Sequence, residues 1–291
     1  MKYTMVAIDL DGTLVDKNNH IAIEDKQAIT RLVNSSVTVA LCTERVVQSA
    51  MPVVEELGIR TYHMFYDGAF IANPHTKFEL YSQAIEATLL QEVVDFCRQH
   101  NIHLGLYANG GDFSGGNPLG EHWAAAITTD FLYTEHPNWS DVIHRDFLNI
   151  EPTRVNFDDI VGKKSICKAE LMVNCDEEAI QAKQLKDYFG DRLHYSMAYS
   201  PALSDIDFIN ILHPYVSRGD ALMKLMECWG IAPPEVVAIG DGLNDISLLK
   251  TAGISVAMGN ACSDLKQIAS YITNPIEEHG VAKAINFFFP V

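Results

Sequence analysis

The stretch Met5-Val-Ala-Ile-Asp-Leu-Asp-Gly-Thr-Leu14 decides how this chain of 291 residues folds and where its chemistry lies. The apolar run from Met5 to Ile8 predicts a buried strand of a parallel sheet, because strands covered on both faces are apolar throughout. Asp9 and Asp11 follow at the carboxyl end of that strand, where open α/β sheets bind ligands. One carboxylate can act there as nucleophile and metal ligand, and the other as proton donor and acceptor. A calcium loop is excluded, because Gly12 comes fourth from Asp9 rather than sixth.

A second stretch, Val236-Val-Ala-Ile-Gly-Asp-Gly-Leu-Asn-Asp245, repeats the pattern far away in the sequence. Its apolar run predicts another buried strand, which ends in Asp241, and Asp245 follows four residues later. Carboxylate oxygens suit Mg²⁺, a hard ion that keeps waters for a phosphate to replace. The two stretches together predict a carboxylate cluster that binds magnesium.

Strand and helix patterns alternate at both ends of the chain. The expected strands are 3–8, 37–42, 236–239 and 254–257, and the expected helices are 23–34, 46–57, 219–229, 246–251 and 261–269. This alternation predicts an α/β fold with a doubly wound, Rossmann-like parallel sheet and helices on both of its faces.

The middle of the chain has a different pattern and predicts an inserted α+β domain. Helices are expected at 85–100 and 177–189, and strands at 102–107, 169–173, 193–197 and 206–211, while 110–162 gives no clear pattern. We therefore expect a core formed by residues 1–82 and 211–291, interrupted by a second domain over residues 83–210.

The two aspartate stretches resemble the motifs of the haloacid dehalogenase superfamily, whose phosphatases form an aspartyl-phosphate. The tail, Ser255-Val-Ala-Met-Gly-Asn260 followed by the segment 274–281, is similar to its Cof-type, sugar-phosphatase-like branch. The resemblance implies that the inserted domain is a cap that closes over the active site. It also implies a Mg²⁺-dependent hydrolase of phosphoric monoesters.

The resemblance implies a role for each matching residue. Asp9 would attack phosphorus, and Asp11 would protonate the leaving oxygen and then deprotonate the attacking water. Asp9, Asp241 and the backbone carbonyl of Asp11 would hold Mg²⁺, while Asp245 braces the water shell of the metal. Asn244 would help to fix the loop that carries Asp245.

The phosphoryl group would be bound by Thr43 and Arg218. Thr43 follows the strand 37–42, and its hydroxyl is also suited to cap the helix that begins near Val46. The full set of expected substrate-binding residues is Thr43, Glu44, Arg45, Asp67, Gly68, Arg218 and Asn244.

Three of these positions depart from the pattern of the family. Arg218 stands where the family has a lysine, Glu44 where it has a glycine, and Asp67 where it has an asparagine. Arginine keeps the positive charge but lacks the compact ammonium group of lysine. Glu44 and Asp67 add negative charge near a site for a dianion. If the phosphoryl site still needs a cation at this position, Arg218→Ala should lose most of the activity, and Arg218→Lys, which restores the residue of the family, should keep or raise it.

Composition limits the partners of the protein. The formal net charge of −17 argues against nucleic acid and anionic membranes. It would also repel a phosphorylated substrate unless a metal and local cations reverse the potential in the cleft. The absence of a long apolar segment and of a signal-peptide pattern predicts a cytoplasmic protein.

We therefore expect a phosphatase that hydrolyses a small phosphorylated metabolite, such as a sugar phosphate, as a monomer or homodimer. A phosphomutase of the same superfamily is an alternative. The three departures also leave open a catalytically weak sensor that binds phosphorylated ligands.

Overall fold

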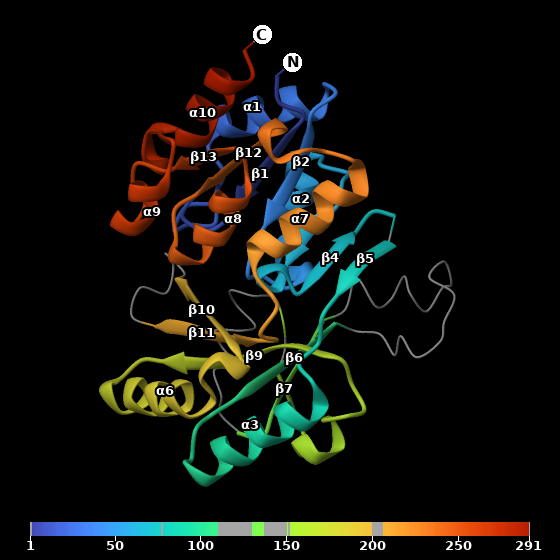
Figure 1. Ribbon diagram of the computed structural model, residues 1–291, viewed down its shortest axis with the longest axis vertical. Helices are drawn as coiled ribbons and strands as arrows, with labels where there is room; N and C mark the ends of the chain where they lie inside the picture. Colours follow the sequence, from blue (N-terminus) through green and yellow to red (C-terminus); the bar gives the residue numbers. More distant parts are fainter. Residues whose placement is uncertain are drawn as a thin grey trace.

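The computed structural model describes residues 2–76, 78–109, 130–136, 150, 152–199 and 206–290. Within these residues the strands form two sheets, one of eight strands and one of six. Figure 1 shows the eight-stranded sheet in the part that holds both termini, and the six-stranded sheet in the part below it.

The eight-stranded sheet has the order β14-β13-β12-β1-β2-β3-β4-β5. Its strands are β1 (Met5–Asp9), β2 (Thr38–Cys42), β3 (His63–Phe65), β4 (Phe70–Asn73), β5 (Phe78–Ser82), β12 (Val236–Gly240), β13 (Ile254–Ala257) and β14 (Tyr271–Ile272). The strands from β14 to β3 pair in parallel, whereas β4 and β5 continue the sheet as an antiparallel hairpin. The expected fold class is confirmed, although the sequence did not predict this hairpin.

Helices cover both faces of this sheet. They are α1 (Ile23–Val33), α2 (Val47–Leu57), α7 (Arg218–Trp229), α8 (Ile246–Thr251), α9 (Ser263–Ile268) and α10 (Gly280–Phe288). α1 packs against α2 and α10, while α7 and α9 pack against α8. Every residue of β1 and β12 is buried, as expected for central strands covered on both sides.

The six-stranded sheet has the order β10-β11-β9-β6-β7-β8 and is antiparallel except between β7 and β8. Its strands are β6 (Gly105–Asn109), β7 (Asp130–Thr134), β8 (Pro152–Arg154), β9 (Ile166–Val173), β10 (His194–Tyr199) and β11 (Asp207–Leu212). The helices α3 (Ala87–Gln99) and α6 (Asp176–Phe189) accompany it.

The two faces of this second sheet differ in character, because alternate residues of a strand point to opposite sides. Leu106, Ala169 and Ile211 belong to an apolar cluster with α3 and α6. Their neighbours Tyr107 and Leu212 instead join the apolar cluster of the first sheet. The face that carries these neighbours therefore lies against the eight-stranded part of the protein.

Short 3₁₀ turns connect several elements, and two of them carry residues of the expected site. These two are η1 (Tyr66–Gly68) and η5 (Leu243–Asp245). The others are η2 (Phe157–Asp159), η3 (Gly190–Arg192), η4 (Pro233–Glu235) and η6 (Ile276–Glu278).

The strands of the second sheet all come from the interior of the chain, between residues 105 and 212. This origin is compatible with an inserted domain, but β11 runs two residues past the expected boundary at 210. The division into a core and a cap remains a prediction. Among the described residues, no helix is both long and apolar enough to cross a bilayer.

Candidate active site

With the exception of Arg218, the expected site residues follow the carboxyl ends of four neighbouring strands of the first sheet. Asp9 is the last residue of β1, Thr43 follows β2, and Asp241 follows β12. Asp67 lies in η1, directly after β3, and Arg218 is the first residue of α7. Residues far apart in the sequence thus meet at one edge of the sheet, where α/β proteins bind ligands.

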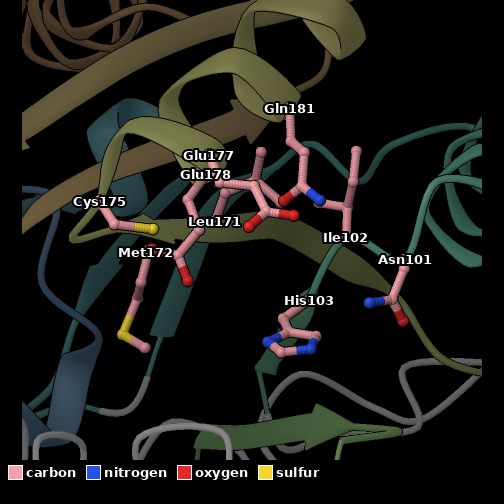
Figure 2. A pocket seen from close by; sticks show the side chains of 9 residues that line it. All are labelled: Asn101, Ile102, His103, Leu171, Met172, Cys175, Glu177, Glu178 and Gln181. Carbon is pink, nitrogen blue, oxygen red and sulfur yellow. The ribbon is translucent and has the colours of Figure 1, made fainter.

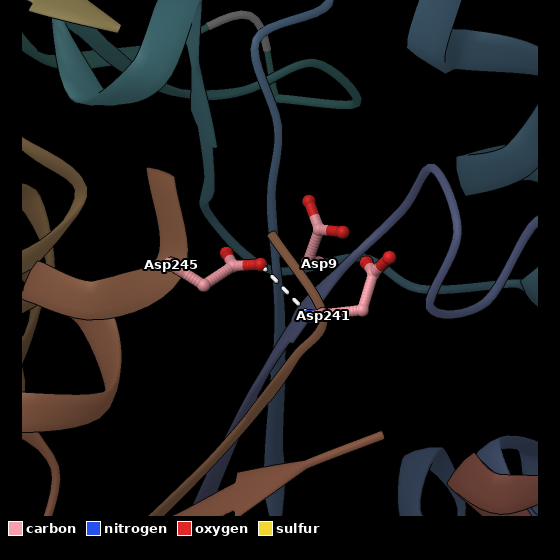
Figure 3. A group of neighbouring side chains, drawn as sticks. All are labelled: Asp9, Asp241 and Asp245. Atoms are coloured by element: carbon pink, nitrogen blue, oxygen red, sulfur yellow. Dashed lines mark hydrogen bonds between the residues drawn. The ribbon is translucent and has the colours of Figure 1, made fainter. Parts of the chain in front are cut away.

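Three carboxylates meet at the centre of this edge. Asp9, Asp241 and Asp245 each place an oxygen within 4.8 Å of the others (Figure 3). Asp245 is held by its own loop, since its Oδ2 accepts hydrogen bonds of 3.0 Å from the backbone amides of Asp241 and Gly242. Burial, and then the negative charge of Asp245, raise the pKa of Asp241 to about 7 and that of Asp9 well above its usual value.

This cluster fits a divalent metal ion. Carboxylate oxygens are the donors that Mg²⁺ prefers. Burial and, after it, the repulsion between the carboxylates raise the pKa values of Asp9 and Asp241 in spite of the nearby Arg218. A bound divalent cation would remove this repulsion.

Two side chains that the sequence analysis did not assign support Asp241. The Thr13 hydroxyl donates to Asp241 Oδ1 at 2.7 Å, and Asn260 Nδ2 donates to the Gly12 carbonyl at 2.8 Å. Gly12 has φ +84°, and a Cβ there would lie 2.4 Å from Asp241 Oδ2. The glycine of the first stretch therefore allows the loop after β1 to approach Asp241. Thr13 and Asn260 both stand in the motifs quoted above, which is the signal that would have identified them.

Arg218 is fully enclosed by acidic groups. It is 1 % exposed. Its Nη1 donates to Asp9 at 2.7 Å and to Asp245 at 2.6 Å. Its Nε donates to Asp67 at 2.8 Å, and its Nη2 donates to Glu44 at 2.9 Å. Burial alone would lower the pKa of Arg218, but these carboxylates raise it well above its usual value, so the guanidinium stays charged.

The three departures from the family pattern therefore form one structural unit. A lysine ammonium is compact, whereas a guanidinium presents five N–H donors in a rigid plane. Glu44 and Asp67 accept from the two nitrogens of Arg218, Nη2 and Nε, that do not contact Asp9. Burial and the charge of Asp11 raise the pKa of Glu44 to about 7. For Asp67, Arg218 and the Ser196 hydroxyl outweigh the effect of burial and lower the pKa.

The carboxylate of Asp11 lies outside the three-carboxylate cluster. Both of its oxygens accept from Arg45, at 2.8 Å from Nε and at 2.6 Å from Nη2. The Thr43 hydroxyl accepts from the backbone amide of Arg45 at 3.0 Å. Helix α2 starts after Val46 without a side-chain cap, so Thr43 does not cap it. Its expected role as a phosphoryl ligand remains a prediction.

Asp67 and Gly68 lie where the first sheet meets the second. Asp67 has φ +53°, a left-handed conformation that is uncommon for residues other than glycine. Its Oδ2 accepts from Ser196 Oγ at 2.5 Å and from Asn210 Nδ2 at 2.9 Å. Gly68 has φ +98°, and a Cβ there would lie 2.6 Å from the Ser217 carbonyl. Asp67 is thus bonded to the second sheet and Gly68 lies close to the residue before α7, and nothing in their local sequence indicates these partners.

A cavity of about 370 Å³ lies beside Arg218, between β10 and the segment from η5 to α8. Asn244 lines this cavity, together with Asp67, Lys186, His194, Tyr195, Ser196, Met197, Arg218, Leu243, Ile246 and Ser247. The cavity adjoins the buried charges and provides room for a small ligand.

A second cavity, of about 190 Å³, lies elsewhere in the six-stranded part (Figure 2). Its side chains come from β9, the N-terminal end of α6 and the segment before β6, and include His103, Cys175 and Glu178. It contains none of the expected site residues.

Comparison with known proteins agrees with this geometry. The family model for haloacid dehalogenase-like hydrolases matches residues 6–285. The chain belongs to that family. The putative phosphatase YxeH of Bacillus subtilis is 28 % identical over 98 % of this chain and 97 % of its own length. The 5-amino-6-(5-phospho-D-ribitylamino)uracil phosphatase YwtE of the same organism is 28 % identical over 97 % and 96 %.

Solved structures show the same fold. A haloacid dehalogenase-like hydrolase from Bacteroides thetaiotaomicron superimposes with a TM-score of 0.79 at 24 % identity, over 99 % of this chain and 100 % of that one. The expected family and the expected enzyme class, a haloacid dehalogenase-like phosphatase, are both confirmed.

Proposed function

We propose that this protein is a Mg²⁺-dependent phosphatase that hydrolyses a small phosphorylated metabolite through an aspartyl-phosphate on Asp9. The observation that carries the proposal is the position of Asp9, buried at the end of β1 between Arg218 and the carboxylates of Asp241 and Asp245. The phosphorylated ribityl compound in the name of YwtE supports a small phosphate ester with hydroxyl groups as the substrate class.

The reaction has two steps, which use the same two aspartates. An oxygen of Asp9 attacks phosphorus, the bond to the leaving oxygen breaks, and Asp11 gives that oxygen its proton. Water then attacks the same phosphorus, Asp11 takes a proton from it, and the bond to Asp9 breaks to release inorganic phosphate. Arg45 holds both oxygens of Asp11, so Asp11 exchanges one of these contacts when it transfers a proton.

The remaining residues neutralise charge and hold the phosphoryl group. Asp9, Asp241 and the backbone carbonyl of Asp11 would hold Mg²⁺, with Asp245 bracing its water shell, and the ion would reduce the repulsion between a phosphate dianion and the nucleophile. Thr43 and Arg218 bind phosphoryl oxygens. Of the five N–H groups of Arg218, four donate to carboxylates among the described residues, which leaves one on Nη2 for the substrate.

The first test replaces the nucleophile. Asp9→Asn is nearly isosteric and should lower phosphate release from p-nitrophenyl phosphate and from a panel of sugar phosphates by several powers of ten. Asp25→Asn is the matched control, because Asp25 is also buried but accepts a hydrogen bond from the backbone of Ala282 instead of contacting the site. If Asp9→Asn keeps more than about a hundredth of the activity, Asp9 is not the nucleophile.

The second test concerns the metal. Turnover should disappear in excess chelator, return with Mg²⁺ and be inhibited by Ca²⁺, which takes more ligands at longer distances and engages both oxygens of the nucleophile. Binding of Mg²⁺, measured by calorimetry, should be weaker in Asp241→Asn. Full turnover in excess chelator would contradict the metal assignment.

The enclosure of Arg218 also favours a second candidate, a catalytically weak protein that binds phosphorylated ligands. Four carboxylates compete with the substrate for this one cation. Tight binding of a sugar phosphate without any release of phosphate would favour this candidate over the phosphatase.

A further inference from the structure

We propose that the second sheet positions the phosphoryl-binding arginine of the first: Ser196 and Asn210 hold Asp67, and Asp67 in turn holds Arg218. The inference rests on the proposed function, in which Arg218 contacts the phosphoryl group. It makes Ser196 and Asn210 positioning residues for a reaction whose chemical groups all lie in the other part of the protein.

The contacts form a continuous chain between the two sheets. Ser196 on β10 and Asn210 on β11 stand opposite each other in the pairing of these strands. Both side chains donate to Asp67 Oδ2, and the other oxygen of Asp67 accepts from Arg218 Nε. All four side chains are at least 90 % buried. Figure 1 shows β10 and β11 at the side of the second sheet that is nearest to the first.

Asp67 controls the orientation of the guanidinium group. A guanidinium is planar, so Asp67 on Nε and Glu44 on Nη2 together fix the rotation of the plane that the contacts of Nη1 alone would leave free, and Asp67 is the fully buried one of the two. Asp67 fixes that rotation only while its own carboxylate is held. The hydrogen bonds from Ser196 and Asn210 are therefore what keeps the carboxylate in register with Arg218.

The amide of Asn210 shows that this contact has a cost in the fold. Its Nδ2 donates to Asp67 and to Ser196 Oγ, while its buried Oδ1 has no hydrogen-bond partner among the residues that the structure describes. A buried acceptor without a partner is rare in folded proteins and calls for an explanation. The positioning of Asp67 explains it. The opposite amide orientation would place Oδ1, an acceptor, against the Asp67 carboxylate, and Asp67 would lose the donor that holds it.

The test measures kinetics with p-nitrophenyl phosphate at saturating Mg²⁺. Ser196→Ala and Asn210→Leu should each lower kcat on the order of tenfold, because misplacing a catalytic cation affects the transition state more than the ground state. KM should change much less than kcat. Ser196→Thr keeps the hydroxyl and should restore turnover. Thr134→Val is the control, since it removes another buried hydroxyl of the second sheet, one that accepts a hydrogen bond of 3.0 Å from the backbone amide of His136.

A double-mutant cycle shows whether Asp67 transmits the effect. In an Asp67→Ala background, Ser196→Ala should cause no further loss of kcat, because its route to Arg218 is already broken. An equal loss in both backgrounds, or unchanged kcat in the single variants, overturns the proposal.

Hydrogen exchange gives a second measurement that requires neither activity nor a stable Asp67→Ala protein. Exchange in segments 64–69 and 216–220 should increase in Ser196→Ala and Asn210→Leu but not in Thr134→Val. Unchanged exchange in those segments overturns the proposal. If the unmodified protein releases no phosphate while exchange changes as expected, the proposed function fails and the coupling between the sheets stands.

Discussion

At the scale of single residues, Arg218 connects most of the acidic groups of the site. Asp9 and Asp245 share its Nη1, and Glu44 and Asp67 take the other two nitrogens. Glu44 and Asp67, which from the sequence alone would only oppose a phosphate, each have a cationic partner. Their negative charges are therefore part of the same arrangement as the arginine.

This arrangement reverses the expectation for Arg218→Lys. A single ammonium cannot reach all four carboxylates that the guanidinium contacts, so the buried Asp67 and the partly buried Glu44 would lose their cationic partner. Breaking a buried pair on one side costs about 3–5 kcal/mol. We predict that Arg218→Lys lowers kcat/KM on the order of a hundredfold and lowers the urea midpoint of unfolding.

The matched variant restores the pattern of the family at all three positions. Arg218→Lys combined with Glu44→Gly and Asp67→Asn removes the two unpaired carboxylates and should recover most of the activity and stability lost in Arg218→Lys. If Arg218→Lys alone behaves like the unmodified protein, the three substitutions are independent and the unit described above does not exist.

At the scale of elements, strand β3 contains a buried titratable group. His63 is completely buried, and its Nδ1 accepts a hydrogen bond of 3.2 Å from the backbone amide of Leu41 on β2. This bond supplements the short pairing of β2 with β3, in which Cys42 lies opposite Met64. Burial, and then His75, lower the pKa of His63 to about 3. The unfolded chain has an ordinary histidine pKa of about 6.5.

This difference predicts a pH dependence of stability. The contribution of neutral His63 is fully present above about pH 6.5 and is lost as the pH falls toward 3, because the unfolded state then binds a proton that the folded state does not. Between pH 6.5 and 5 the free energy of unfolding should fall by about 2 kcal/mol from this group. Urea denaturation of His63→Asn, whose amide oxygen replaces Nδ1 as acceptor, should lack this component. Equal pH slopes in both proteins would show that His63 is not the source.

The sequence predicts most strands of the first sheet, but it does not predict the side-chain contacts between the two sheets. The apolar runs of β1 and β12 predicted two buried strands of a parallel sheet, and the carboxylates after them do meet, because the structure pairs these two strands in parallel. The β4–β5 hairpin was not predicted, since its strands are short and partly polar. Asp67 is separated in the sequence from Ser196 by 129 positions and from Asn210 by 143 positions, and no local periodicity encodes contacts between such distant residues.

At the scale of the whole molecule, the formal net charge of −17 opposes an anionic substrate. The Debye length falls from about 30 Å at 0.01 M salt to about 8 Å at 0.15 M, so salt screens the distant charges of the surface more than it screens the buried cations of the site.

We therefore predict that KM for p-nitrophenyl phosphate falls by about threefold over this range of KCl concentrations, while kcat stays constant. Mg²⁺ must be saturating throughout, because its own binding weakens as salt increases, and NaCl in place of KCl controls for specific ion effects. An increase of KM with salt would mean that Arg218, Arg45 and the metal already dominate the potential that the substrate meets on approach, so that the charge of the remaining surface plays no part in binding.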